Sequence, residues 1–152
     1  MVAVRAARST DYEAVLALYR ELMGENPVIE GANGERRFAE VLAHPGTTLF
    51  VAEEDGAVVS VATLHVLPNM TFGGKPYALV ENVVTLARCQ GRGLGTQVME
   101  HLIEAAWGAG CYKIMLLTAQ GYGARDFYAK LGFSDTDKHG MTLRRAPPRR
   151  PR

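Results

Sequence analysis

The stretch QGRGLGT, residues 90–96, follows an apolar run and opens a segment with helical periodicity. Its three glycines allow positive φ angles and let the backbone approach a ligand closely. A helix that begins here directs unpaired N–H groups and the positive end of its dipole towards the turn. A strand, a glycine-rich turn and a helix N-terminus together typically bind phosphate. Because Arg92 adds a positive charge, the stretch predicts an anion-binding loop.

Two other glycine-rich phosphate motifs do not fit this stretch. A P-loop ends in Gly-Lys-Ser/Thr, whereas here the turn ends in Leu94-Gly95-Thr96 without a lysine. The dinucleotide-binding fingerprint, counted from Gly91, requires a glycine where the chain has Thr96, and it belongs near the start of a parallel βαβ fold. A glycine turn with a purely structural role remains as the alternative.

The chain has 152 residues, of which 47% are hydrophobic and 22% charged, as in a soluble globular protein. This length predicts one domain over residues 1–145, followed by a disordered Arg- and Pro-rich tail over 146–152. No apolar run approaches the ~20 residues of a membrane span, and the N-terminus lacks the apolar segment of a signal peptide. We therefore expect a cytoplasmic protein with no membrane partner.

The charge is distributed unevenly along the chain. The last nine residues hold five arginines and no acid, which leaves 12 basic against 16 acidic side chains in the rest. An acidic body is not built for nucleic acid, so no nucleic-acid partner is expected. The tail is expected to be solvated, with contact to nucleic acid or an acidic partner as the weaker alternative.

The cysteines and histidines indicate neither a metal site nor a nucleophilic triad. Cys89 and Cys111 have no CxxC partner and no His at zinc-ligand spacing, so free thiols and no metal are expected. His65 lies in an apolar strand. Its sequence context fits a hydrogen-bonded core residue and a substrate contact equally well. His101 follows Glu100 on a long helix and is expected to face solvent.

The hydrophobic periodicity predicts alternating strands and helices in a single α/β layer, with antiparallel hairpins first and one crossover later. Thr10 and Glu13 form a capping box, and Asp55-Gly56 is a hairpin turn. The fold class is therefore α/β, a mixed and mostly antiparallel sheet flanked by helices. The predicted strands are 2–6, 49–53, 58–67, 77–86 and 112–117, with two more before Leu143; the predicted helices are 10–24, 35–43, 95–109 and 124–131.

A second motif identifies a family. The Gln-x-x-Gly-x-Gly run after a strand, with ARDFYAKLGF at residues 124–133 about thirty residues later, resembles the GNAT-family N-acetyltransferases. The resemblance extends over nearly the whole chain before the tail. It implies the GNAT fold and acetyl-CoA as the acetyl donor. In relatives an Asn often contacts the cofactor three residues before the second motif, where this chain has Gly121. The cofactor-binding residues that the resemblance implies are Val83, Val84, Cys89, Gln90, Gly91, Arg92, Gly93, Leu94, Gly95, Thr96, Phe127 and Lys130.

Acetyl transfer to an amine requires an uncharged amine, although an alkylamine has a pKa of about 10, and it benefits from a proton donor to the leaving thiolate. Glu81 is the one acid in the otherwise uncharged strand YALVENVV, residues 77–84, and is our candidate base. A salt-bridged or edge-exposed glutamate is the alternative. Tyr128 matches the Tyr of the family's closing motif and is by resemblance the general acid, with groove packing as the alternative.

The acceptor is less well defined. The runs VENVV, residues 80–84, and GCYKI, residues 110–114, look like the corresponding strands of glucosamine-phosphate N-acetyltransferases. This favours a small polar amine such as an amino sugar, a polyamine or an amino-acid-like molecule. A peptide or protein acceptor is the second reading, and a non-catalytic acetyl-CoA sensor the third. Many relatives dimerise, so the resemblance also implies a homodimer.

Overall fold

The computed structural model describes residues 1–120 and 123–149. The chain divides into two compact units, residues 1–116 and 117–152. The first unit holds the sheet and the helices that cover it, and the second holds one short helix, α5 (Arg125–Lys130). The predicted single domain over 1–145 stays a prediction. Among the described residues, no helix is both long enough and apolar enough to cross a bilayer.

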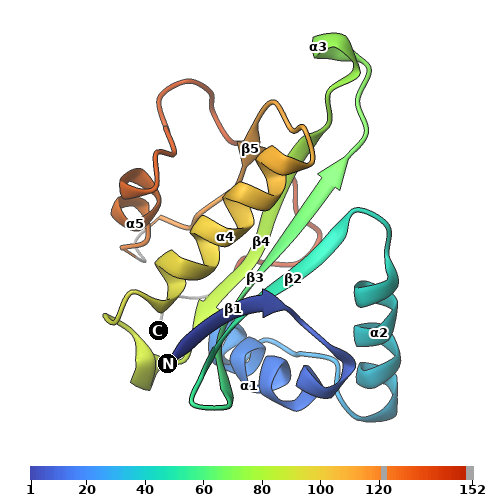
Figure 1. Cartoon of the computed structure of the whole chain (residues 1–152), viewed down its shortest axis with the longest axis vertical. Coiled ribbons are helices and arrows are strands. Elements are labelled where there is room, and N and C mark those ends of the chain that lie inside the picture. The colour runs from blue at the N-terminus through green and yellow to red at the C-terminus, as the bar shows by residue number, and fades with distance from the viewer. Residues whose placement is uncertain (121–122, 150–152) are drawn as a thin grey trace. The chain divides into compact units, whose positions relative to one another are not determined.

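The first unit is built on one five-stranded mixed sheet, whose strands follow one another in chain order (Figure 1). Neighbouring strands from the first to the fourth are antiparallel, and the fifth is parallel to the fourth. This confirms the predicted fold class. The strands are β1 (Val2–Ala6), β2 (Thr47–Glu54), β3 (Ala57–Leu67), β4 (Tyr77–Thr85) and β5 (Ile114–Met115).

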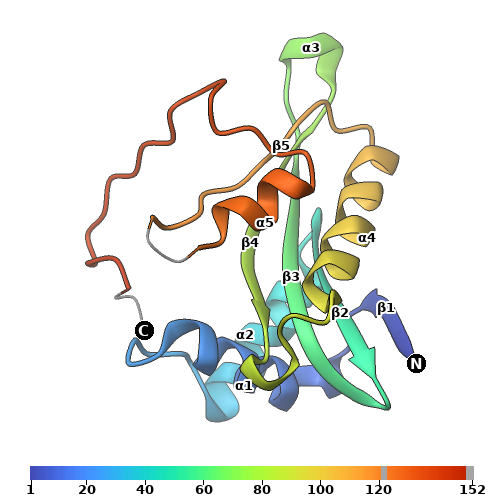
Figure 2. The same cartoon turned by 90° about the vertical axis from the view of Figure 1, so that its left-hand side faces the viewer.

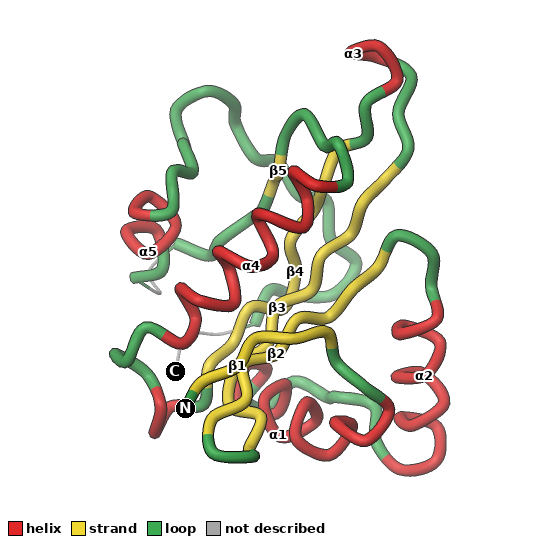
Figure 3. The backbone as a smooth tube through the Cα atoms, in the orientation of Figure 1, coloured by secondary structure: helices red, strands yellow, loops and turns green. Residues whose placement is uncertain are grey.

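Helices cover both faces of this sheet. The helices α1 (Tyr12–Met23) and α2 (Gly31–Ala43) lie on one face, and α4 (Leu94–Gly108) crosses the other (Figures 1 and 2). Between β3 and β4 the chain extends into a long connection that ends in the single turn α3 (Thr71–Gly74), seen at the top of Figure 3.

Alternation along the strands divides the apolar side chains between the two faces. On the α1 side, Val51 and Val61 pack with Val15 and Leu18 of α1 in one buried cluster. On the α4 side, the ring of Phe50 meets His101 edge-on, with centroids 5.3 Å apart. The predicted His101 position is thus confirmed as exposed, although its ring contacts the sheet.

The predicted hairpin turn and the predicted end of the first long helix are confirmed. Asp55 and Gly56 connect β2 and β3 with φ of 50° and 82°, as a two-residue hairpin turn with positive φ at both positions requires. Gly24, with φ of 60°, ends α1.

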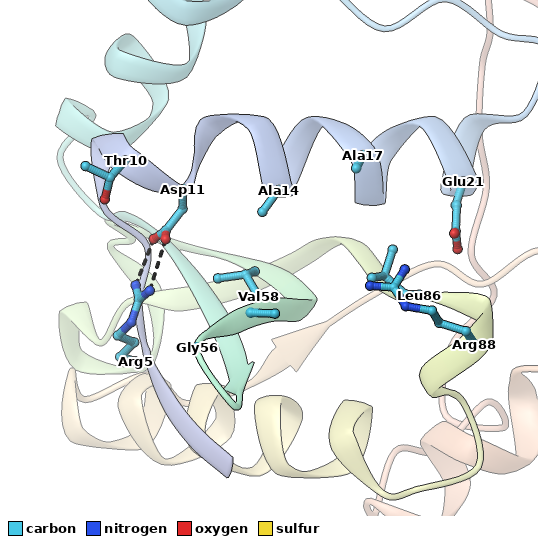
Figure 4. Close-up of a pocket in the computed structure, with 11 residues that line it drawn as sticks. Arg5, Thr10, Asp11, Ala14, Ala17, Glu21, Gly56, Val58, Leu86 and Arg88 are labelled. Carbon is cyan, nitrogen blue, oxygen red and sulfur yellow. Dashed lines mark hydrogen bonds and ion pairs between the residues drawn. The ribbon is translucent and has the colours of Figure 1, made fainter. Parts of the chain in front are cut away.

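The predicted capping box at the start of α1 is wrong. Residues Ser9–Asp11 form a 3₁₀ turn before the helix, and the carboxylate of Asp11 accepts the backbone N–H of Arg8 at 2.7 Å. The same carboxylate accepts two hydrogen bonds from Arg5 of β1, at 2.7 and 3.0 Å (Figure 4). Since a bidentate ion pair is stronger than a hydroxyl cap, the tertiary contact with β1 determines where the helix begins.

The predicted helix over 35–43 is too short, because α2 begins at Gly31 rather than at Glu35. A Cβ at Gly34 would lie 2.3 Å from the Tyr12 hydroxyl oxygen and 2.8 Å from the Ile29 carbonyl oxygen. The helix therefore needs a glycine for close packing, against the low helix propensity of that residue.

The C-terminal strands are also predicted incorrectly. The strand expected over 112–117 is reduced to the two residues of β5, and neither of the two short strands expected before Leu143 is present among the described residues. Instead, the Ser134 hydroxyl bonds to Thr136 and Asp137. Such local side-chain bonds compete with strand pairing, which a sequence pattern does not reveal.

The ion pair between Arg5 and Asp11 gives a stability prediction. Its hydrogen bonds from Arg5 hold the Asp11 pKa below the usual range. The contribution is therefore present above about pH 4 and is lost as the pH falls through the lowered pKa. Asp11→Asn should lower the free energy of unfolding by about 2 kcal/mol at pH 7, measured by urea denaturation.

The loss should shrink on acidification below about pH 4, because protonation removes the same charge from the wild-type protein. Asp55→Asn is the control, since Asp55 is 83% exposed and pairs with the N-terminus. It should change stability by less than about 0.5 kcal/mol. Equal losses in the two variants would contradict this account of the pair.

Candidate active site

The glycine turn has the geometry of an anion-binding loop. Gly91 and Gly93 have φ of 74° and 78°, and Gly93 is the N-cap of α4. The first helical bond runs from the Gln97 N–H to the Gly93 carbonyl. The N–H groups of Leu94, Gly95 and Thr96 therefore precede the hydrogen-bonded part of the helix.

Space is open on the glycine side of this turn. A Cβ built on Gly91 or on Gly93 would meet no atom within 4 Å, so the glycines are needed for their φ angles and not to relieve crowding. No side chain caps the N-terminus of α4 in the described part of the chain. Free N–H groups at a helix N-terminus beside open space suit an oxyanion such as a phosphate.

The side chains of the turn fall into two groups. Cys89 and Leu94 are buried in the core cluster on the α1 side, so any part they take in cofactor binding rests on their backbone. Arg92 and Gln90 are exposed: the Arg92 guanidinium pairs with Glu54 of β2 at 2.5 Å, and the Gln90 amide donates to the Thr85 carbonyl at 3.1 Å.

β4 carries a bulge just before the turn. Thr63 of β3 faces Glu81 and Val61 faces Val84, so two residues of β4 oppose one of β3. Asn82 in the bulge has φ of 53°, a left-handed conformation that Asn tolerates better than most residues. A non-glycine residue held in that conformation at a bulge is an observation that suggests function.

The outer edge of β4 is paired over only part of its length. Among the described residues, β5 pairs with β4 at two positions, Ala78 and Leu79. Within that part of the chain, no strand pairs with β4 beyond Leu79 on this side, where Val83 and Val84 lie. Unpaired backbone groups on a strand edge can form hydrogen bonds with an extended amide chain, as in strand addition.

Glu81 lies on the α1 face of the sheet. Thr63 lies two residues after Val61, which packs on the α1 side, so Thr63 projects to the same side. Glu81 is directly opposite Thr63, and facing residues of antiparallel strands project to the same face. The Glu81 side chain is exposed, and no salt bridge is found for it in the described part of the molecule. Of the two alternatives to a base, the salt-bridged glutamate is not observed among the described residues. The exposed glutamate on the strand is consistent with the structure.

One polar side chain near Glu81 has no signal in the sequence pattern. Tyr19 lies on the apolar face of α1, and its ring packs on the core cluster. Its hydroxyl, however, interacts with Thr63 and Asn82. Burial raises the pKa of Tyr19, and these two interactions offset part of the rise. Helical periodicity predicts the direction of a ring and carries no signal for the partner of its hydroxyl.

The second unit contains the other predicted catalytic residue. Tyr128 lies in α5, and its ring meets Phe127 and Phe133 edge-on at centroid distances of 5.0 and 6.0 Å. The Phe133 N–H donates to the Tyr128 carbonyl at 3.1 Å, and Gly132 turns the chain with φ of 97°. Lys130 is exposed at the end of α5. Gly121 lies outside the described residues.

The remaining chemistry-bearing side chains have structural partners. His65 bonds through Nδ1 to the Thr47 hydroxyl at 2.8 Å, and His44 bonds to the same hydroxyl at 3.0 Å. Cys89 and Cys111 are free and buried, and burial raises the pKa of the Cys111 thiol. The described residues include no group of three or more His, Cys, Asp or Glu side chains arranged to hold a metal ion.

A surface cavity of about 440 Å³ lies between α1 and the β2–β3 hairpin (Figure 4). The paired Arg5 and Asp11 line one end, and Glu21 and Arg88 line the other. None of the predicted site residues lines it. The carboxylate of Glu21 accepts the Ala87 N–H at 2.8 Å and so ties α1 to the segment before the glycine turn.

Comparison with known proteins agrees with this geometry. The family model described as "Acetyltransferase (GNAT) family" matches residues 15–133. The chain belongs to the GNAT family of acetyltransferases. It is therefore an N-acetyltransferase of the acetyl-CoA-dependent GNAT type, as the sequence motifs predict.

Named relatives of this GNAT chain include two glucosamine 6-phosphate N-acetyltransferases. The one from Trypanosoma brucei brucei is 32% identical over 80% of this chain and 84% of its own length. The one numbered 1 from Oryza sativa subsp. japonica is 37% identical over 78% of this chain and 72% of its own length. A solved structure from Agrobacterium tumefaciens str. C58, assigned to the acetyltransferases, is 44% identical with a TM-score of 0.89, over 94% of this chain and 99% of that one.

The left-handed glycine of the turn gives a prediction. Gly93→Ala should lower stability by about 1–2 kcal/mol, because an L-residue is strained at positive φ. It should also weaken acetyl-CoA binding, measured by calorimetry, by moving the N–H groups of the turn.

Gly108→Ala at the other end of α4 is the matched control. Gly108 has open space around it and no positive φ, so alanine there should be neutral or stabilising by up to about 1 kcal/mol. Unchanged acetyl-CoA affinity in Gly93→Ala would remove the turn from the cofactor site.

Proposed function

We propose that this enzyme moves the acetyl group of acetyl-CoA to the primary amine of a small polar molecule, with an amino sugar as the first candidate. The observation that carries the proposal is the order of features along one strand. The bulge with Glu81, the open edge at Val83 and Val84 and the glycine turn follow one another within about fifteen residues. In an extended acetyl-CoA molecule the thioester, the amide arm and the pyrophosphate follow one another in the same order. The acceptor lies beside the thioester end, where Glu81 is.

The pyrophosphate of acetyl-CoA binds to the glycine turn in this proposal. The backbone N–H groups from Gly91 to Thr96 supply the donors, and the dipole of α4 favours the negative charge. Arg92 adds a positive charge, although its pair with Glu54 neutralises part of it. The amides of the pantetheine arm pair with the open edge of β4 at Val83 and Val84. The sequence resemblance adds Phe127 and Lys130 to the same cofactor site.

Glu81 is the proposed base. It removes a proton from the acceptor ammonium, directly or through a water, so that the neutral nitrogen attacks the thioester carbonyl carbon. The C–S bond then breaks and the electron pair leaves on sulfur. The nitrogen loses its second proton to solvent as the amide forms, and solvent returns a proton to Tyr128 after the transfer. Tyr128 is the proposed acid that donates a proton to the departing thiolate; its match to the family's closing motif supports this role.

The acceptor proposal rests on the two relatives named as glucosamine 6-phosphate N-acetyltransferases and on the similarity of β4 to strands of that group. A peptide acceptor is the second candidate, because the acidic body would attract a basic segment. We also propose that the protein is cytoplasmic and forms homodimers, which sedimentation velocity at micromolar concentration tests.

The acceptor is tested by incubation with acetyl-CoA and a pool of amines, followed by mass spectrometry. The pool contains glucosamine 6-phosphate, glucosamine, polyamines, amino acids and basic peptides. An acetylated amino sugar is the expected product. Acetylation of peptides alone would favour the second candidate, and acetyl-CoA binding with no product would contradict the proposed transfer to these amines.

The base is tested by Glu81→Gln. Removing the carboxylate should lower kcat/KM by roughly 100-fold or more near pH 7, because an alkylamine is almost fully protonated there. The loss should become smaller as the pH rises towards the amine pKa. A pH–rate profile measures both effects, and a variant whose acidic limb matches that of the wild type would exclude Glu81 as the base.

The acid is tested by Tyr128→Phe. This variant should lower kcat by roughly 10- to 100-fold and leave acetyl-CoA affinity within about twofold, because the ring is kept and the proton donor is lost. Phe127→Leu is a control for groove packing, which should affect affinity more than turnover. Normal turnover in Tyr128→Phe would limit Tyr128 to packing.

A further inference from the structure

The α1 face of the sheet contains an unusual buried hydroxyl beside the bulge of β4. Thr63 is 3% exposed, and its Oγ1 has no hydrogen-bond partner among the described residues. A buried hydroxyl without a partner destabilises a fold and calls for an explanation. Valine has nearly the same shape, so a purely structural role would favour it at this position.

Thr63 stands at the meeting point of three elements. It faces Glu81 across the β3–β4 ladder. The hydroxyl of Tyr19, from α1, interacts with Thr63 and also with Asn82 of the bulge. The Tyr19 hydroxyl therefore lies close to Thr63 Oγ1, but the two do not form a hydrogen bond of ordinary geometry.

Tyr19 and Asn82 are the members of this cluster that a ligand can reach. Asn82 is exposed and Tyr19 is half-buried, whereas Thr63 is buried. Burial raises the Tyr19 pKa, which keeps the phenol neutral and able to donate a hydrogen bond throughout the physiological pH range. Tyr19, Thr63 and Asn82 carry no charge, and the carboxylate that faces Thr63 is Glu81, which the proposed function assigns to the reacting amine. The cluster therefore suits an uncharged polar group beside that amine and disfavours a phosphate.

We propose that Tyr19 binds the acceptor through a hydroxyl group next to the reacting amine, and that Thr63 and Asn82 position the Tyr19 hydroxyl for this contact. The inference rests on the proposed function and specifies it further. An amino alcohol or amino sugar offers such a hydroxyl beside its amine, whereas a linear polyamine does not. The cluster would therefore select hydroxylated amines.

The test compares acceptor kinetics in four variants, with glucosamine 6-phosphate as the acceptor. Tyr19→Phe should raise the acceptor KM by roughly five- to tenfold, as loss of one hydrogen bond implies, with kcat nearly unchanged. Its acetyl-CoA affinity, measured by calorimetry, should equal that of the wild type. Tyr12→Phe is the matched control, because Tyr12 is half-buried on the same helix and its hydroxyl donates to the Gly31 carbonyl at 3.5 Å.

Thr63→Val and Thr63→Ser separate positioning from packing. Thr63→Val should raise the thermal midpoint, because it removes the unpaired hydroxyl, and should also raise the acceptor KM. Thr63→Ser keeps the hydroxyl and should keep the wild-type KM. A higher midpoint with an unchanged KM in Thr63→Val would show that Thr63 has no part in acceptor binding.

The outcomes distinguish this inference from the function on which it rests. If the wild-type chain acetylates none of the pooled amines, the proposed function fails and the inference fails with it. If the wild type acetylates the amino sugar and Tyr19→Phe has an unchanged KM, the role of Tyr19 alone is overturned. Equal activity on a linear diamine and on its hydroxylated analogue would overturn the selection for hydroxyl groups.

Discussion

The proposed cofactor site depends on the incomplete pairing of β4. Over the described residues β5 accompanies β4 at Ala78 and Leu79, and beyond that point the edge of β4 has no neighbouring strand. The backbone of this edge leads directly to the glycine turn and to the N-terminus of α4. One continuous path therefore presents peptide groups first and a positive helix end afterwards. An extended ligand with amides at one end and phosphates at the other matches this order.

The bulge in β4 determines what lies beside that edge. Two residues of β4 oppose one of β3 there, and Asn82 takes a left-handed conformation. Glu81 consequently shares the α1 face with Thr63, while Asn82 interacts with Tyr19 of α1. The bulge that interrupts the β3–β4 ladder thus places the Glu81 carboxylate beside the uncharged side chains of Thr63 and Asn82. Strain at one residue is offset by the surrounding packed sheet.

The sequence allowed most of the fold and the loop to be predicted, because these depend on local signals. Positive φ at Gly93 and at Asp55-Gly56 follows from residue type, and the course of α4 follows from its apolar spacing. The start of α1 was mispredicted because the carboxylate of Asp11 binds Arg5 of another strand.

Other features depend on contacts between residues that are distant in sequence. Gly34 inside α2 is required because Tyr12 lies close to it, and helix propensities do not predict such a contact. The hydroxyl of Tyr19 meets Thr63, which is 44 positions later in the chain (63 − 19), so the apolar pattern of α1 could not indicate a polar role. Two short strands were expected before Leu143, and a sequence pattern does not supply the neighbouring strand that pairing requires.

The most direct test of the account is amide hydrogen exchange with and without acetyl-CoA. We predict slower exchange at Val83 and Val84 on the open edge of β4 and at residues 91–96 of the glycine turn. The amides of β1, an edge strand at the other side of the sheet, should exchange at the same rate in both states. Protection of β1, or unchanged exchange along β4 and the turn at saturating acetyl-CoA, would contradict the claim that this strand edge and its turn hold the cofactor.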